Sequence, residues 1–189
     1  MGAQKVLLPY GGRTVVEHIV HALEKGGADE VIVVTGHQGD RVASTLQSMR
    51  VRIAFNEVYP AGMLSSVRCG VRAASARTQA FLIALGDQPS IRTDVVKKLI
   101  AEFKNHKGHS GIILVPTHDG RRGHPMMFTR HFRDQVLSRF DDVGLRGLLD
   151  AYSEAIRELP MEQAEILRDM DSPEEYASEL DALERRRRK

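Results

Sequence analysis

A carboxylate stands directly after an apolar run in the segment Phe81-Leu82-Ile83-Ala84-Leu85-Gly86-Asp87-Gln88-Pro89. The glycine permits a close backbone approach, and the proline ends strand pairing. Ligands bind at the carboxyl ends of the strands in an open parallel sheet. Mg²⁺ usually takes one or two carboxylates together with phosphate oxygens and water. Asp87 is therefore a candidate magnesium ligand, and capping of a turn is an equally good interpretation.

A second pair of carboxylates lies near the C-terminus, in Asp169-Met170-Asp171. Residues two apart in an extended segment point to the same side, so both could face one ion. An acidic residue before a helix is also favoured by the helix dipole, which leaves structural capping as the alternative. A two-carboxylate magnesium site nevertheless needs a second ligand remote from Asp87.

The segment Gly62 to Gly70 joins a turn to an expected helix start and contains Ser65, Ser66 and Arg68. Free backbone donors and hydroxyls at such a start can hold the edge of a base or an anionic group. Arg68 adds a fixed positive charge. An ordinary serine-capped helix is the alternative.

The loop Gly120 to Pro125 carries two guanidinium groups and the imidazole of His124 between glycines. Arginine forks match phosphate oxygens, so the loop could hold an anionic substrate. A solvated turn is the alternative. At the other end of the chain, Lys5 lies close to the first expected helix and indicates little by itself.

Short β-branched runs alternate with amphipathic stretches, which predicts a doubly wound α/β fold with a mostly parallel sheet and helices on both faces. Thr14 and Ser172 each open a capping box, and Asp40 is a candidate helix cap. Gly26-Gly27 should end the first helix. The expected strands are 31–34, 51–55, 81–85, 112–115 and 155–159, with less clearly marked helices at 132–140 and 145–152.

Composition sets the broader limits. A chain of 189 residues with 42% apolar and 28% charged residues fits one domain over residues 1–189, with a helical basic tail at 177–189. A net charge of +2 does not suggest a nucleic-acid partner, and the arginines of the tail are best read as a solvated helix end. Cys69 is the only cysteine, so no internal disulfide can form. We expect a cytoplasmic protein with no membrane partner, because no apolar run spans a bilayer and no signal segment follows Met1.

Taken together, these segments resemble the molybdenum cofactor cytidylyltransferases, within the MobA-like NTP transferase superfamily that also includes guanylyl-transferring enzymes. The resemblance extends over nearly the whole chain. It rests on five ordered motifs, which are Met1 to Pro9, Gly62 to Gly70, Ala84 to Pro89, Arg122 to Pro125, and Asp169 to Tyr176.

The resemblance implies a role for each motif. Asp87 and Asp171 would hold Mg²⁺, and Lys5 would contact the triphosphate, which makes Lys5 and Asp87 the catalytic candidates. Gly2, Ser65, Ser66 and Arg68 would lie on the nucleotide side with them, and Arg122, Gly123, His124 and Pro125 on the acceptor side. The implied substrates are CTP and molybdopterin, joined with release of pyrophosphate.

The sequence departs from the family at its start. Members usually open with a strand followed by Leu-Ala-Ala-Gly-x-Ser-x-Arg-Met-Gly-x-x-Lys, and this chain begins at the Met-Gly of that pattern. We therefore expect the first strand and most of the nucleotide loop to be encoded in frame upstream of Met1.

Two other interpretations stay open. One is transfer of another nucleotide, such as GTP, or transfer to a sugar or alcohol phosphate. The other is a non-catalytic protein that holds the finished cofactor and delivers it to a molybdenum hydroxylase apoenzyme.

Overall fold

The computed structural model describes residues 4–106 and 111–187. The candidate residue Gly2 lies outside these ranges. The strands are β1 (Pro9–Tyr10), β2 (Arg13–Thr14), β3 (Ile32–Thr35), β4 (Arg52–Phe55), β5 (Ala80–Ile83), β6 (Ile113–His118), β7 (Arg121–Arg122), β8 (Met126–Thr129) and β9 (Ile156–Pro160). The helices are α1 (Val15–Gly26), α2 (Gly39–Thr45), α3 (Met63–Ala73), α4 (Thr93–Asn105), α5 (Arg133–Ser138), α6 (Arg146–Ala151) and α7 (Pro173–Arg187), with short 3-10 turns that include η2 (Tyr59–Ala61) and η5 (Ala164–Leu167).

The larger sheet is mixed rather than mostly parallel. Its strand order is β5-β8-β6-β7, and β9 also pairs with β6. The strand β8 runs antiparallel to both β5 and β6, whereas β9 runs parallel to β6. The short run Met126–Thr129 is buried and does not alternate in polarity, so it carries little strand signal of its own.

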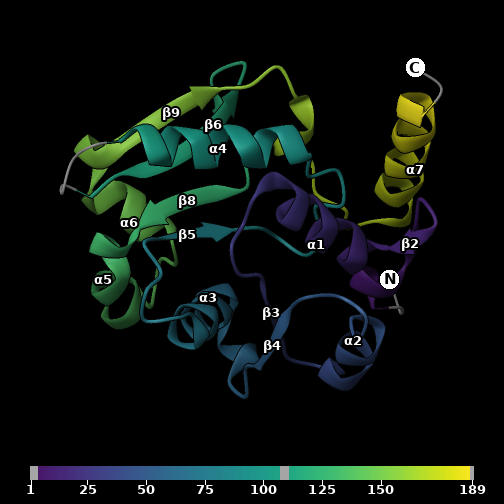
Figure 1. The fold of residues 1–189 in the computed structure, drawn as a ribbon, viewed down its shortest axis with the longest axis horizontal. Helices are drawn as coiled ribbons and strands as arrows, with labels where there is room; N and C mark the ends of the chain where they lie inside the picture. The colour runs from purple at the N-terminus through teal and green to yellow at the C-terminus, as the bar shows by residue number, and fades with distance from the viewer. Residues whose placement is uncertain (1–3, 107–110, 188–189) are drawn as a thin grey trace.

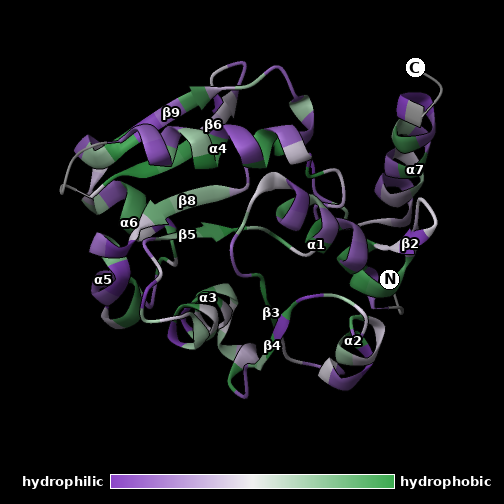
Figure 2. Cartoon of the chain, in the orientation of Figure 1, coloured by the Kyte–Doolittle hydropathy of each residue, from purple (hydrophilic) through white to green (hydrophobic). Residues whose placement is uncertain are grey.

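Helices cover both faces of this sheet, as the alternation of apolar and polar runs predicts. Along β6, Ile113 and Val115 pack in one cluster with α3, α5 and α6, while Leu114 packs in the opposite cluster with α4. Successive side chains of a strand point to opposite faces, so the apolar run of β6 contributes side chains to the packing on both faces of the sheet. Figure 1 shows α4 and α3 on opposite sides of β5 and β8, and Figure 2 shows the apolar colouring of β5 and β8.

The strands β3 and β4 form a separate parallel pair. They pack with α1 and α2 around Val20, Val31 and Leu46, which are buried. Asn56 continues this pair, because its backbone N–H donates to the carbonyl of Thr35 (2.8 Å). The carboxyl ends of β3 and β4 therefore lie side by side.

The N-terminal ribbon β1–β2 and the C-terminal helix α7 meet at one end of the molecule (Figure 1). Tyr10, Ile19 and Met170 form a buried cluster there, against which Leu180 packs from α7. The hydroxyl of Tyr176 donates to the carbonyl of Pro9 (2.6 Å). Residues more than 160 positions apart are thus brought together.

Both predicted capping boxes are confirmed. The Glu17 N–H donates to the Thr14 hydroxyl and the Thr14 N–H to the Glu17 carboxylate, and the pair Ser172 and Glu175 repeats this pattern. The predicted cap at Asp40 is wrong. Gly39 packs against the side chain of Thr35, and α2 already begins there, which places Asp40 inside the first turn.

No helix among the described residues is long and apolar enough to cross a membrane.

Candidate functional site

Asp87 lies in the turn that follows β5, where sequence reasoning places it. One carboxylate oxygen, Oδ1, is buried and has no hydrogen-bond partner in the described part of the chain. Burial raises the pKa of the Asp87 carboxyl above its ordinary value, and the charges of Asp171 and Asp169 act in the same direction. A hydrogen bond from its own backbone N–H and the charge of Lys5 oppose this rise. The Oδ1 atom of this half-buried carboxylate therefore has its hydrogen-bonding capacity unused among the described residues.

The structure brings Lys5 and Asp171 into direct contact, although 166 positions separate them. The Lys5 Nζ lies 2.7 Å from Asp171 Oδ1. Met170, between the two aspartates, is fully buried, while Asp169 and Asp171 are exposed. This alternation agrees with the expected extended segment, and both aspartates act electrostatically on Asp87.

His124 lies in the loop after β7, and its imidazole interacts electrostatically with Asp87. The Gly123 N–H donates to the carbonyl of Pro116 (2.8 Å) and the His124 N–H to that of Ile166 (2.9 Å), which fixes the backbone of this loop. Burial lowers the pKa of the His124 imidazole, against the opposing charge of Asp87 and a ring hydrogen bond to the backbone of Ile83. Its Nδ1 is buried and has no partner among the described residues. The ring is thus favoured as a neutral imidazole with an acceptor nitrogen available.

Ser65 and Ser66 form a second polar group at the start of α3. The amide of Asn56 donates from Nδ2 to both hydroxyls, at 2.8 Å and 3.1 Å, and the Ser65 hydroxyl donates to the carbonyl of Gly62 (2.7 Å). Asn56 is buried and directly follows β4. The sequence analysis missed Asn56, although the strand-end argument used for Asp87 applies to it as well.

Two candidate arginines are used elsewhere. Arg68 donates from Nε to the carbonyl of Val136 (2.9 Å) and from Nη2 to that of Arg139 (2.7 Å), and it pairs with Asp141. Its donors are therefore taken up in holding α3 to α5, so the expected nucleotide contact has no geometric support. Arg122 pairs with Glu158 (2.8 Å) at the edge of the sheet.

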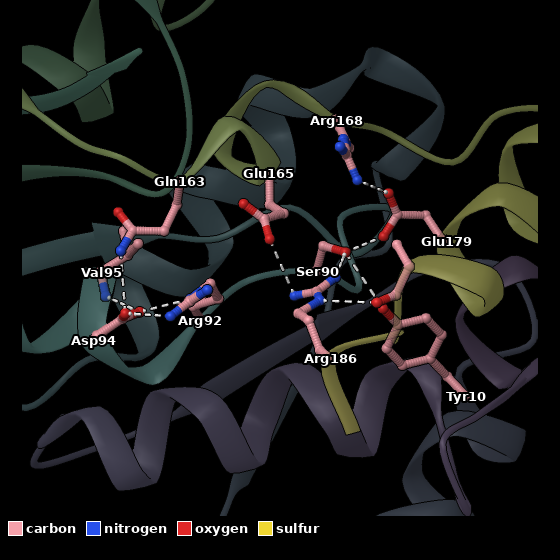
Figure 3. Close-up of polar contacts among 11 residues, drawn as sticks. Tyr10, Ser90, Arg92, Asp94, Val95, Gln163, Glu165, Arg168, Glu179 and Arg186 are labelled. Atoms are coloured by element: carbon pink, nitrogen blue, oxygen red, sulfur yellow. Dashed lines mark hydrogen bonds and ion pairs between the residues drawn. The ribbon is translucent and has the colours of Figure 1, made fainter. Parts of the chain in front are cut away.

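A buried polar network supports the turn that carries Asp87 (Figure 3). Ser90, three residues after Asp87, contacts the Glu179 carboxylate, accepts from Arg186 Nη2 (2.9 Å), and lies 3.3 Å from the hydroxyl of Tyr10. Arg186 also lies 3.4 Å from Glu165, so it is not the solvated tail residue that the sequence suggests.

The charged group fits a divalent cation that brings other ligands with it. No group of three His, Cys, Asp or Glu side chains within residues 4–106 and 111–187 is arranged to hold a metal by itself. Asp87 offers a buried carboxylate oxygen, and the negative charges of Asp171 and Asp169 act electrostatically on the Asp87 carboxyl. Mg²⁺ typically takes one or two carboxylates and completes its shell with phosphate oxygens and water. These residues fit a divalent cation that obtains most of its ligands from a bound molecule and water.

The mixed α/β sheet with helices on both faces is the fold of a nucleotidyl transferase from Methanothermobacter thermautotroptrophicus, which superposes with a TM-score of 0.81 at 25% identity and covers 97% of this chain and 87% of its own. Two solved structures of Rv0371c from Mycobacterium tuberculosis H37Rv, one of them a manganese complex, share this fold. They superpose with TM-scores of 0.82 and 0.79, cover 96% and 95% of this chain and 90% and 93% of their own, and are each 22% identical to it.

The chain belongs to the MobA-like NTP transferase family, whose domain matches residues 1–156. The molybdenum cofactor cytidylyltransferase of Escherichia coli K12 is 30% identical over 181 residues, which span 93% of this chain and 86% of that protein. The nicotine blue oxidoreductase of Paenarthrobacter nicotinovorans is 34% identical over 148 residues, which span 77% of this chain and 72% of that protein. The resemblance inferred from the motifs is thereby confirmed at the level of the family.

Proposed function

We propose that this protein transfers CMP from CTP to molybdopterin, releasing pyrophosphate and forming the cytosine dinucleotide of the cofactor. The observation that carries the proposal is the buried, unpartnered carboxylate oxygen of Asp87 at a strand end, beside Asp171 and Lys5. The likeness to the cytidylyltransferase of Escherichia coli supports the choice of nucleotide and acceptor.

In this proposal Asp87 and Asp171 hold Mg²⁺, whose chemistry is to neutralise the phosphate charge and to orient the phosphoryl group for in-line displacement. The manganese complex of the Mycobacterium tuberculosis protein supports a divalent cation. A terminal phosphate oxygen of molybdopterin forms a bond to the α-phosphorus of CTP, and the bond from that phosphorus to the bridging oxygen of pyrophosphate breaks. The protein supplies alignment and charge, so no protein nucleophile is needed.

The proposed roles of Lys5 and Asp171 require that their ion pair loosen when substrate binds. Lys5 is assigned to the triphosphate and Asp171 to the cation, yet the two side chains lie 2.7 Å apart and neutralise each other. On substrate binding, Lys5 would leave Asp171 for the phosphate oxygens of the triphosphate, and the released Asp171 carboxylate would be available to hold the cation.

In this proposal the remaining polar groups contact the base of CTP on one side and the pterin acceptor on the other. The Ser65 and Ser66 hydroxyls, held by Asn56, lie on the side of the base. His124 and Pro125 lie on the side of the acceptor, where the free Nδ1 of a neutral imidazole can accept a hydrogen bond from the pterin. A pocket that fits a pyrimidine edge rejects a purine by size and by leaving buried polar groups unpaired.

A comparison of nucleotides tests the proposal. CTP, GTP and ATP are each offered to the protein in turn, with molybdopterin or a sugar phosphate as acceptor. We expect pyrophosphate release with molybdopterin and CTP at least about a hundredfold faster than with GTP or ATP. Equal use of GTP, or release that needs a sugar phosphate, would move the protein to another transferase activity.

A redox activity is the second candidate, because a relative at 34% identity is an oxidoreductase. Incubation of the same protein with nicotine blue and a hydride donor distinguishes the two. Reduction of the dye without any nucleotidyl transfer would favour the redox activity. Tight binding of the cytosine dinucleotide with neither activity would favour the delivery protein.

A further inference from the structure

The two carboxylates assigned to the cation come from segments far apart in the chain, and one helix joins them. Asp171 stands just before α7, and Asp87 stands three residues before Ser90. Glu179, about two turns into α7, contacts Ser90 directly. The contact between Glu179 and Ser90 thus connects the segment of Asp171 to the turn of Asp87.

Glu179 is unusually well buried for a glutamate. Only 3% of the residue is exposed, and Arg168 lies 3.6 Å from its other carboxylate oxygen. Ser90 is 2% exposed and also bonds Arg186, and Tyr10 is fully buried beside it. Buried polar groups cost free energy unless they are hydrogen-bonded, so this network tolerates little displacement. Figure 3 shows these side chains converging on Ser90 from α7, β1 and the turn after β5.

The same helix also fixes the lysine segment. The Tyr176 hydroxyl of α7 holds the carbonyl of Pro9, four residues after Lys5, and Tyr10 joins the network at Ser90. The segments that carry Lys5, Asp87 and Asp171 are therefore all connected to α7 by hydrogen bonds or by the chain itself. None of the network residues carries a phosphate-binding or metal-binding role in the proposed function.

We propose that Glu179 is a positioning residue that, through Ser90, sets the separation of Asp87 and Asp171. This inference rests on the proposed function. Loss of the Glu179 contact frees the turn at residues 86–90 to move relative to α7, which weakens a cation held by both carboxylates. A displacement of about 1 Å is enough to reduce transfer by about a hundredfold.

A double-mutant cycle on cation affinity tests the inference. Mn²⁺ binding in the presence of CTP is measured by electron paramagnetic resonance for the wild type, Glu179→Gln, Ser90→Ala and the double variant, with melting curves recorded alongside. We expect each single variant to bind Mn²⁺ roughly fivefold or more weakly, and the double variant to be no weaker than the worse single one, because residues in one network are not additive. Asp181→Asn, which removes an exposed carboxylate from α7, is the matched control and should bind Mn²⁺ as the wild type does.

The outcomes separate this inference from the proposed function. Single variants within twofold of the wild type, or fully multiplicative effects in the double variant, would overturn the positioning role, whether or not the melting temperature falls. Asp87→Ala in the same assay reports on the cation site itself. If Asp87→Ala leaves Mn²⁺ affinity unchanged, the proposed function fails; if it lowers the affinity while Glu179→Gln and Ser90→Ala do not, only the positioning role fails.

Discussion

Replacement of Asp87 by alanine or asparagine should reduce metal-dependent nucleotidyl transfer by at least about a hundredfold while the fold is retained. The carboxylate is the only group at the end of β5 proposed to hold the cation, and removing it disturbs cation binding and phosphate alignment together. Transfer is measured as pyrophosphate release, with folding checked by circular dichroism. Near-normal turnover in a folded variant would rule out the proposed role.

The asparagine variant should also be at least as stable as the wild type at neutral pH. Burial raises the pKa of the Asp87 carboxyl, so the folded protein disfavours its ionised form. This cost is absent below the unfolded carboxyl pKa of about 4 and fully present above the folded pKa. Thermal unfolding midpoints should therefore favour Asp87→Asn more at pH 7 than at pH 4. A clear stability loss confined to pH 7 would contradict the assignment.

Gly123→Ala should combine a large structural effect with a large functional one. A Cβ at Gly123 would lie 2.4 Å from the carbonyl oxygen of Ile166 and 2.8 Å from the carbonyl carbon. These are backbone atoms, so a side-chain rotation cannot relieve the clash. Overpacking of this kind costs about 1–3 kcal/mol, and each kcal/mol lowers the unfolding midpoint by roughly 2–4 °C in a chain of this size. The loop must move away from η5, which carries His124 away from Asp87 and should reduce transfer by roughly a hundredfold.

Gly120→Ala is the matched control in the same loop. Gly120 has a φ of +73° but no atom within 4 Å of an added Cβ, so alanine there costs about 1 kcal/mol of backbone strain without displacing His124. Calorimetry should show a smaller fall in the midpoint for Gly120→Ala than for Gly123→Ala, and pyrophosphate release should be lost only in Gly123→Ala. Retained transfer in a destabilised Gly123→Ala would show that the place of His124 is not needed.

The sequence predicted those elements whose signal is local. Thr14 and Ser172 open helices through hydrogen bonds to residues three positions away, and such spacing can be read directly. The strands β3, β4, β5 and β6 follow β-branched or aromatic runs, and the observed bounds differ from the expected ones by at most three residues. Asp87 was found because a strand end is marked by the change from apolar to polar residues.

The parts that were missed depend on pairing between remote segments. The antiparallel insertion of β8 between β5 and β6 is set by tertiary packing rather than by the polarity of Met126–Thr129. From the sequence alone Arg68 is expected to contact the nucleotide, and only the structure shows its partners on α5 and the following turn. Glu179 looks like an exposed position of a charged helix, and only the proximity of Ser90 shows its burial.

A crystal structure with Mn²⁺ and CTP tests the central claim most directly, because the anomalous signal locates the cation without assumption. We predict one anomalous peak bound by Asp87 and Asp171 at about 2.1–2.2 Å, with phosphate oxygens completing its shell. The Lys5 ammonium should have left Asp171 for the triphosphate, and the cytosine should lie beside Ser65 and Ser66. A peak away from both carboxylates, with Lys5 still paired to Asp171 while CTP is bound, would contradict the account.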